Sequence, residues 1–252
     1  MTRGDSVTST ARRWPGTCHT VAMLVLAHRG ASRDAPENTP EAFRLADRQG
    51  ADGVELDVRL HPSGRLLVRH DPLPADNSDA ASPPTLDDAL DACGDRMLVN
   101  VEIKNLASDG GFDPTMSIAA RTIDVLRRRG ERWSDRWLIS SFSWATIQAC
   151  RRIAPEIPTA LLCITVTPAM IDRVVAGGHA AIHPWERALD AATVDRCHDA
   201  GLRVNTWTCN DPARLVELAA FGVDAVCTDV PAVALAALSR PPGKRGESVE
   251  PE

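Results

Sequence analysis

Residues 26–72 read LAHRGASRDAPENTPEAFRLADRQGADGVELDVRLHPSGRLLVRHDP. The apolar run 23–27, which leads into this segment, predicts a buried strand with His28 and Arg29 at its carboxyl end. The glycine that follows permits a sharp turn away from the strand. Thr39, followed by proline and glutamate, is typical of the first residues of a helix. The segment therefore begins with a strand, a turn and a helix.

Two acidic side chains alternate along the next strand, which we expect at residues 53–58. Glu55 and Asp57 stand at positions i and i+2 and share one face, while the valines and leucine around them take the other. Two carboxylates side by side repel each other unless a positive charge lies between them. A bound metal ion is the simplest source of that charge.

A second histidine follows on a strand that we expect at residues 65–70. This strand comes too soon after Asp57 for a parallel crossover, which needs about a dozen residues or more. The link 61–64 contains proline, serine and glycine and predicts a hairpin turn. Folding the chain back around this turn puts His70 roughly opposite Glu55, so local pairing alone carries a histidine to the carboxylates.

Beyond the hairpin, predicted strands and helices alternate. We expect strands at 98–102, 137–141, 159–162, 180–183, 203–207 and 225–228, and helices at 86–92, 114–129, 144–154, 169–176, 191–200, 212–221 and 232–238. Repeated βα units indicate a parallel sheet. Eight of them in roughly 215 residues predict a (β/α)8 TIM barrel near the small end of its size range. The alternative, an open doubly wound sheet, calls for a glycine-rich phosphate fingerprint after the first strand, which the sequence lacks.

A barrel of this kind carries its functional side chains at the carboxyl ends of its strands. Most of the polar or aromatic candidates fall there: His28, Arg29, Glu55, Asp57, Glu102, Lys104, Ser141, Phe142, His183, Trp207 and Asp229. The fold prediction and the site prediction therefore support each other.

The composition indicates one soluble globular domain, because 44% of the residues are hydrophobic and 25% are charged. We expect this domain at residues 23–239. Residues 1–22 are interpreted as a disordered leader, or as the product of a start codon assigned too early, and residues 240–252 as a disordered tail. With a formal net charge of -6, the chain offers no basic patch for nucleic acid, so we expect no nucleic-acid partner.

The seven cysteines are scattered and form no C-x-x-C pair. This pattern indicates single buried thiols in a reducing compartment rather than a disulfide framework or a zinc site. No apolar run reaches the roughly 18 residues of a membrane span, so we expect no stable membrane insertion. The cytoplasm is the default location, and the sequence predicts no oligomeric state.

The ordered motifs HRG (28–30), PENT (36–39), E-x-D (55–57) and HD (70–71) resemble the signature of the glycerophosphodiester phosphodiesterase (GDPD) family. The likeness continues through residues 100–104, 140–142, 207–210 and 222–229, and it covers almost all of the expected domain. The resemblance implies a TIM barrel with a metal-dependent phosphodiesterase activity, which releases sn-glycerol 3-phosphate and an alcohol and belongs to lipid and glycerol metabolism.

The acidic residues Glu55, Asp57 and Glu102 form an all-oxygen set that suits one hard divalent cation, Mg²⁺ or Ca²⁺. A cation held there and open to substrate can polarise the oxygens of a phosphodiester. Lys104 stands two residues after Glu102, so it can meet the same phosphate. Glu102 and Lys104 could otherwise be a plain ion pair.

The two histidines suit acid–base catalysis, because imidazole titrates near neutral pH. In the family that the resemblance implies, one histidine activates the glycerol hydroxyl, or later a water, and the other protonates the departing alcohol. We favour His70 as the base and His28 as the acid, but the sequence leaves this assignment open. Arg29 offers bidentate recognition of two phosphate oxygens. The PENT motif suggests Glu37 as a partner of Arg29 or of the metal.

Three further residues are expected to line the substrate pocket. Trp207 and Phe142 are aromatic side chains near strand ends, of a kind that more often belongs to the core, and His183 ends the strand at 180–183. At the barrel rim we interpret all three as substrate-binding residues for the glycerol or the alcohol.

The sequence departs from the family between the HD motif and the next helix. Members that act on small glycerophosphodiesters often carry some forty residues there, whereas the segment 71–84 is much shorter. A shorter insertion predicts a more open site, so a lysophospholipid is the alternative substrate. Three interpretations remain. The chain hydrolyses glycerophosphodiesters, it has a lysophospholipase D or phospholipase C-like activity on the same barrel, or it is a catalytically silent ligand-binding barrel.

Overall fold

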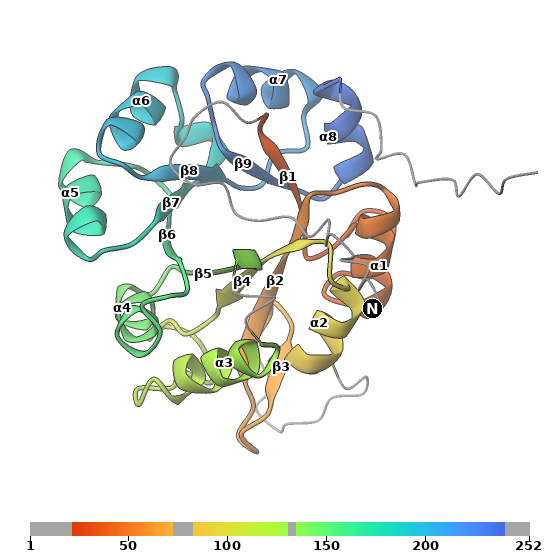
Figure 1. Ribbon diagram of the computed structural model, residues 1–252, viewed down its shortest axis with the longest axis vertical. Helices are drawn as coiled ribbons and strands as arrows, with labels where there is room; N and C mark the ends of the chain where they lie inside the picture. The colour runs from red at the N-terminus through yellow and green to blue at the C-terminus, as the bar shows by residue number, and fades with distance from the viewer. Residues whose placement is uncertain (1–21, 73–82, 131–134, 240–252) are drawn as a thin grey trace, which may run out of the picture.

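The computed structural model describes residues 22–72, 83–130 and 135–239. Within this part of the chain, eight parallel strands form a closed ring, because β1 pairs with β2 on one side and with β9 on the other. The strands are β1 (Leu24–His28), β2 (Gly53–Leu60), β4 (Leu98–Ile103), β5 (Trp137–Ser141), β6 (Thr159–Cys163), β7 (Ala181–Pro184), β8 (Arg203–Thr206) and β9 (Ala225–Thr228). The predicted (β/α)8 barrel is confirmed, and the helices lie outside the ring (Figure 1).

The helices occur where the sequence places them, with small differences at their ends. They are α1 (Pro40–Arg48), α2 (Leu86–Cys93), α3 (Ser117–Arg128), α4 (Trp144–Ile153), α5 (Pro168–Ala176), α6 (Ala191–Asp199), α7 (Pro212–Ala220) and α8 (Pro231–Ala237). Thr39 caps α1 as predicted, since its side chain accepts a hydrogen bond from the Ala42 amide.

The start of α3 is a correction to the prediction at residue 114. Met116 adopts a left-handed backbone with φ 58°, and the helix begins only after it. The carboxylate of Asp113 accepts hydrogen bonds from the Thr115 and Ile118 amides and from the Ser117 hydroxyl. The Met116 amide donates to the Asp113 carbonyl and closes a turn at residues 113–116, and the Asp113 carboxylate joins this turn to the start of the helix.

The predicted hairpin is present, but its return strand is shorter and its register differs by one residue. β3 covers Leu66–Val68 and pairs antiparallel with β2, with Val58 opposite Val68. The turn has three residues between His61 and Arg65, and Gly64 takes φ +85° within it. A two-residue turn would have given the expected pairing, so the extra turn residue moves every partner by one.

The core has two parts. Apolar side chains between the ring and the helices form most of it, and smaller groups lie inside the barrel: Leu24, Leu26, Leu98, Ala225 and Cys227, with Leu138, Ala160 and Ala181. All six described cysteines are buried and unpaired, as the sequence suggests, while Cys18 lies outside the described residues.

No helix in the described ranges is long and apolar enough to cross a bilayer. The expected leader and tail fall almost entirely on residues 1–21 and 240–252, and most of the shortened insertion falls on 73–82. These ranges lie outside the described residues.

Candidate active site

A cavity of about 260 Å³ lies at the carboxyl end of the barrel strands. Most of the candidate residues line it: His28, Arg29, Glu55, His70, Glu102, Lys104, Phe142, His183 and Trp207. Asp57 and Glu37 do not line the cavity but contact a residue that does, since both form ion pairs with Arg29. The barrel therefore brings the predicted site together from segments that are far apart in the sequence.

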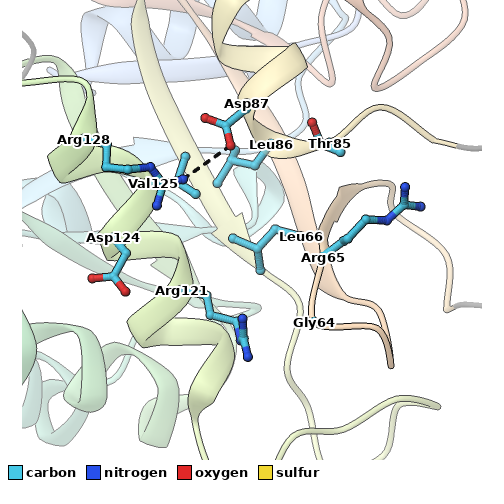
Figure 2. A pocket seen from close by; sticks show the side chains of 10 residues that line it. All are labelled: Gly64, Arg65, Leu66, Thr85, Leu86, Asp87, Arg121, Asp124, Val125 and Arg128. Carbon is cyan, nitrogen blue, oxygen red and sulfur yellow. Dashed lines mark hydrogen bonds and ion pairs between the residues drawn. The ribbon is translucent and has the colours of Figure 1, made fainter.

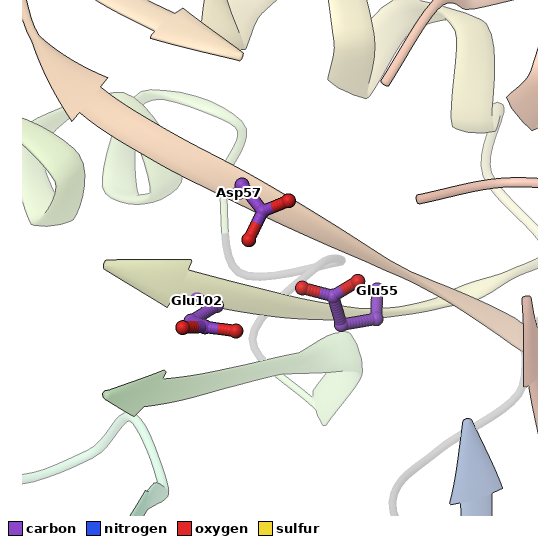
Figure 3. A group of neighbouring side chains, drawn as sticks. All are labelled: Glu55, Asp57 and Glu102. Atoms are coloured by element: carbon purple, nitrogen blue, oxygen red, sulfur yellow. The ribbon is translucent and has the colours of Figure 1, made fainter. Parts of the chain in front are cut away.

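Three carboxylates form a buried cluster on two adjacent strands (Figure 3). Glu55 and Asp57 come from β2, and Glu102 comes from β4, where it stands directly opposite Asp57 in the strand pairing. One oxygen from each residue lies within 4.8 Å of the others. Their exposed fractions are only 3%, 1% and 7%. The alternation predicted from positions 55 and 57 is thus present, and the closed sheet adds Glu102.

The cluster fits a hard cation. Burial raises the pKa of Glu55 well above its usual range, and repulsion from Asp57 and Glu102 raises it further. The Oε1 atom of Glu55 accepts no hydrogen bond from any described residue. A buried carboxylate oxygen without a partner is costly, and three carboxylates at short range are the donor set that Mg²⁺ or Ca²⁺ prefers. The triad can therefore hold a metal ion.

Lys104 is the cationic side chain closest to the cluster. Its Nζ lies 2.6 Å from Glu102 Oε1 and 3.1 Å from Asp57 Oδ1. Burial alone would lower the pKa of Lys104, but the two carboxylates raise it above its usual value. For Asp57, burial is outweighed by Lys104 and Arg29, which hold its pKa below the usual value. The lysine is therefore charged and lies at the cavity.

Arg29 is held in place from three sides. Its Nε lies 3.2 Å from Asp57 Oδ2, and its Nη1 donates to both oxygens of Glu37, at 2.9 and 3.1 Å. Its backbone amide donates to Glu55 at 3.1 Å. The contact with Glu37 is the one that the PENT motif suggests. In the same motif, Asn38 donates to Asp57 Oδ2 at 2.8 Å and accepts from the Asp57 amide.

His28 is paired with a carboxylate that directly follows the last barrel strand. Its Nδ1 lies 2.7 Å from Asp229 Oδ1. Asp229 also accepts hydrogen bonds from Asn210 Nδ2 at 2.6 Å and from the Ser32 hydroxyl at 3.1 Å. Burial opposes ionisation, but the contacts with His28 and Asn210 lower the pKa of Asp229 to about 2. An ionised carboxylate therefore orients the imidazole, whose Nε2 has no hydrogen-bond partner among the described residues.

His70 lies just beyond β3 and is more exposed than His28. Its Nδ1 lies 2.9 Å from Asp71 Oδ1, and the Asp71 side chain is 79% exposed. Arg59 donates to the His70 carbonyl at 2.7 Å, and the Arg69 amide donates to the Asp57 carbonyl at 3.0 Å. These two bonds fix the backbone that brings His70 to the cavity.

The cavity has an apolar side opposite these charges. Phe142 and Trp207 pack edge to face with their ring centroids 5.3 Å apart. Trp207 donates from its indole nitrogen to the His183 carbonyl at 2.8 Å, which fixes the ring. Leu162 extends this surface. The two aromatic residues thus line the cavity, as expected, and also pack on each other.

His183 lines the cavity but is only 2% exposed. Asn205 donates to its Nε2 at 2.8 Å. Burial, aided by the charge on Arg203, lowers the pKa of His183 to about 3. The ring is therefore neutral at physiological pH and is already engaged with Asn205.

Sequence patterns assign no role to four polar residues at this site: Asn38, Asn100, Asn210 and Asp229. Asn38 and Asn210 lie inside the PENT and 207–210 motifs, and Asp229 is expected at the barrel rim without a specific role. Asn100 stands two residues before Glu102 on the same strand face, and this spacing could have identified it.

Two other pockets occur among the described residues. A pocket of about 270 Å³ outside the ring is lined by β3, α2 and α3, where Arg128 faces Asp87 at 3.5 Å (Figure 2). A wider hollow of about 640 Å³ near α7 is lined by Glu186 and Arg214, which pair at 3.1 Å. Neither is lined by a residue that the sequence predicts for the site, although the wider hollow shares Asn210 with it.

Comparison with known proteins gives consistent matches. The chain matches the sequence model of the glycerophosphoryl diester phosphodiesterase family over residues 28–83 and 72–233. It is 29% identical over 239 residues to a glycerophosphodiester phosphodiesterase of Caldanaerobacter subterraneus subsp. tengcongensis, a match that covers 82% of this chain and 94% of the relative.

Two solved structures are similar along almost their whole length. One is a phosphodiesterase from Oleispira antarctica in complex with the product sn-glycerol-3-phosphate, with a TM-score of 0.77 and 25% identity. The match covers 86% of this chain and 97% of the Oleispira antarctica chain. The other is a glycerophosphodiester phosphodiesterase from Agrobacterium tumefaciens str. C58, with a TM-score of 0.65 and 27% identity, covering 85% and 99%.

Proposed function

Since this chain belongs to the glycerophosphoryl diester phosphodiesterase family and is a phosphoric diester hydrolase, we propose that it hydrolyses glycerophosphodiesters to sn-glycerol 3-phosphate and an alcohol. One observation carries the proposal: a single cavity joins a buried carboxylate cluster, two cationic side chains and two histidines. Family membership also makes the catalytically silent barrel the weakest of the three interpretations.

We assign the cation to Glu55, Asp57 and Glu102 and propose Mg²⁺ or Ca²⁺, because the set contains only oxygen donors. When bound, the ion would polarise the phosphoryl oxygens and stabilise the negative charge that gathers on them during cleavage. Asn38 supports cation binding indirectly, since its two hydrogen bonds fix the position of Asp57.

Arg29 and Lys104 are proposed to bind the phosphate. Glu37 and Asp57 hold the guanidinium group of Arg29 in a fixed orientation, so little side-chain entropy is lost when it meets two phosphate oxygens. Lys104 adds a second charge at the same cavity. Together they offset the negative charge of the carboxylates and favour binding of an anionic diester in the cavity.

The histidines are proposed to move protons. His70 would take the proton from the glycerol hydroxyl that attacks phosphorus, and His28 would give a proton from Nε2 to the alcohol oxygen as its bond to phosphorus breaks. A water would then open the resulting cyclic phosphate to sn-glycerol 3-phosphate, with the two histidines exchanging their roles. The assignment of His28 as the acid is supported by Asp229, because an ionised carboxylate at Nδ1 stabilises the positive charge that a proton-donating imidazole carries.

The apolar side of the cavity is proposed to receive the carbon skeleton of the substrate. Phe142 and Trp207 present ring surfaces there, and Lys104 lies 6.0 Å from the Phe142 ring centroid. A glycerol held against these rings would place its phosphate beside the lysine. His183 is proposed to act indirectly, because its backbone carbonyl accepts the hydrogen bond that fixes the Trp207 ring.

A lysophospholipid is the second candidate substrate, favoured by the short segment between Asp71 and α2.

The six described cysteines, all buried and unpaired, support our placement of the enzyme in a reducing compartment, the cytoplasm.

Product analysis distinguishes the two substrate classes. Glycerophosphocholine, glycerophosphoethanolamine and lysophosphatidylcholine would each be incubated with the enzyme and with Mg²⁺, Ca²⁺ or Mn²⁺. Release of glycerol 3-phosphate from the two short diesters supports the proposal. Release of choline from the lysolipid alone would instead assign a lysophospholipase D activity.

A further inference from the structure

Four side chains on β2 and β4 form a square on the inner face of the barrel. The strand pairing places Glu55 directly opposite Asn100 and Asp57 directly opposite Glu102. Residues two apart on a strand share one face, so all four point to the same side. Three corners of the square are the carboxylates of the cluster, and the fourth is Asn100, which lines the same cavity.

The carboxamide of Asn100 is buried without a partner for its oxygen. Its exposed fraction is 1%, and its Oδ1 accepts no hydrogen bond from any described residue. Asn105, which is equally buried, differs: its Oδ1 accepts from the Asp113 amide at 2.8 Å and its Nδ2 donates to the Asp113 carbonyl. Because an unmatched buried acceptor is costly, the position of Asn100 points to a ligand.

We propose that Asn100 Oδ1 is a fourth protein ligand of the divalent cation. The inference rests on the proposed function, which places that cation at Glu55, Asp57 and Glu102. Amide oxygens are common ligands of hard cations. A neutral oxygen adds a ligand without adding to the repulsion among three carboxylates. Water and substrate oxygens would then complete the coordination.

Two other buried acceptors in the barrel are less well placed. The hydroxyl of Ser140 also lacks a partner among the described residues, but it belongs to β5, one strand further from Glu55. Asn205 lies on β8 and already donates to His183. Asn100 alone of these three stands beside Glu55 in the strand pairing.

The test is calorimetric titration of Ca²⁺ and of Mg²⁺ alone into EDTA-treated protein, for wild type, Asn100→Leu and Asn100→Asp. Leucine has nearly the shape of asparagine and lacks the oxygen, so we expect its Kd to rise by about 10-fold or more. Aspartate supplies an oxygen at the same place, so its Kd stays at or below the wild-type value. Without metal, the leucine variant should melt at or above wild type, because an unmatched amide has been removed.

Thr122→Val is the matched control. Thr122 is fully buried on α3 and its hydroxyl also lacks a partner among the described residues, but it lies outside the cavity. The control should share the thermal effect and leave the Kd unchanged.

Equal cation affinity in wild type and Asn100→Leu, with any loss confined to KM, would overturn the inference and leave the carboxylate site standing. No cation binding by wild type would overturn the cation site itself, and the inference with it. If the leucine variant does not fold, the aspartate variant decides: a Kd at or below wild type supports the ligand, and a higher Kd contradicts it.

Discussion

His28 Nδ1 lies 2.7 Å from Asp229 Oδ1, although 201 residues separate the two along the chain. The contact exists because β9 pairs with β1 and closes the barrel. Asn210 and Ser32 hold the same carboxylate from the other sides. Asp229 is therefore a positioning residue for the imidazole, and it is better fixed than the exposed Asp71 that faces His70.

Asp229→Asn should lower kcat by about 10²-fold and leave KM nearly unchanged, because the amide can no longer favour the charged, correctly oriented imidazole. Steady-state kinetics with glycerophosphocholine measure both parameters. Asp71→Asn is the matched control and should cost only a few-fold, since Asp71 is 79% exposed. Equal losses in the two variants would contradict a special role for Asp229.

Changing the leaving group should separate the roles of the two histidines. A p-nitrophenyl ester of glycerol 3-phosphate releases a phenolate that needs no proton, so loss of the acid matters little with this substrate. His28→Ala should therefore recover most of its activity on the p-nitrophenyl ester, whereas His70→Ala stays slow on both substrates. The reverse pattern would exchange the acid and the base.

Glu55→Gln should stabilise the metal-free protein at high pH. The pKa of Glu55 is raised in the folded state by burial and by the neighbouring carboxylates. Its contribution to stability is therefore complete below the unfolded pKa of about 4.3 and is lost as the pH rises through the folded pKa. Glutamine does not titrate, so the gap between the melting temperatures of variant and wild type should widen as pH rises from about 5 to 8.

The same variant should lose the rise in melting temperature that Mg²⁺ or Ca²⁺ gives to wild type, because one of the three ligands is gone. Glu41→Gln, an exposed carboxylate on α1, is the control and should change neither quantity. Lower stability of metal-free Glu55→Gln than of wild type throughout this pH range would contradict the inference that burial and the neighbouring carboxylates destabilise ionised Glu55.

Local patterns in the sequence predict those parts of the fold that depend on neighbours along the chain. The alternation of Glu55 and Asp57 correctly places both on one strand face, and Thr39 correctly marks the start of α1. The hairpin register is wrong by one residue because it depends on the backbone angle of Gly64, which adds a residue to the turn. Patterns of residue type do not specify that angle.

Contacts across the closed ring are harder to predict. The pairing of Asn100 with Glu55 requires the relative stagger of β2 and β4, and the pairing of His28 with Asp229 requires that β9 meets β1. Neither depends on local spacing. The family resemblance supplied the motif residues and suggested Glu37 as a partner of Arg29, but it did not indicate that Asn38 holds Asp57 or that Asp229 holds His28.

The most direct test of the proposed chemistry is the rate of glycerol 3-phosphate release from glycerophosphocholine, with Mg²⁺ or Ca²⁺ and with EDTA, for wild type and His70→Ala. We expect release by wild type with a divalent cation, loss of release with EDTA, and a fall on the order of 10²–10⁴-fold in the variant. No release by wild type with any cation, or equal release by His70→Ala, would contradict the account.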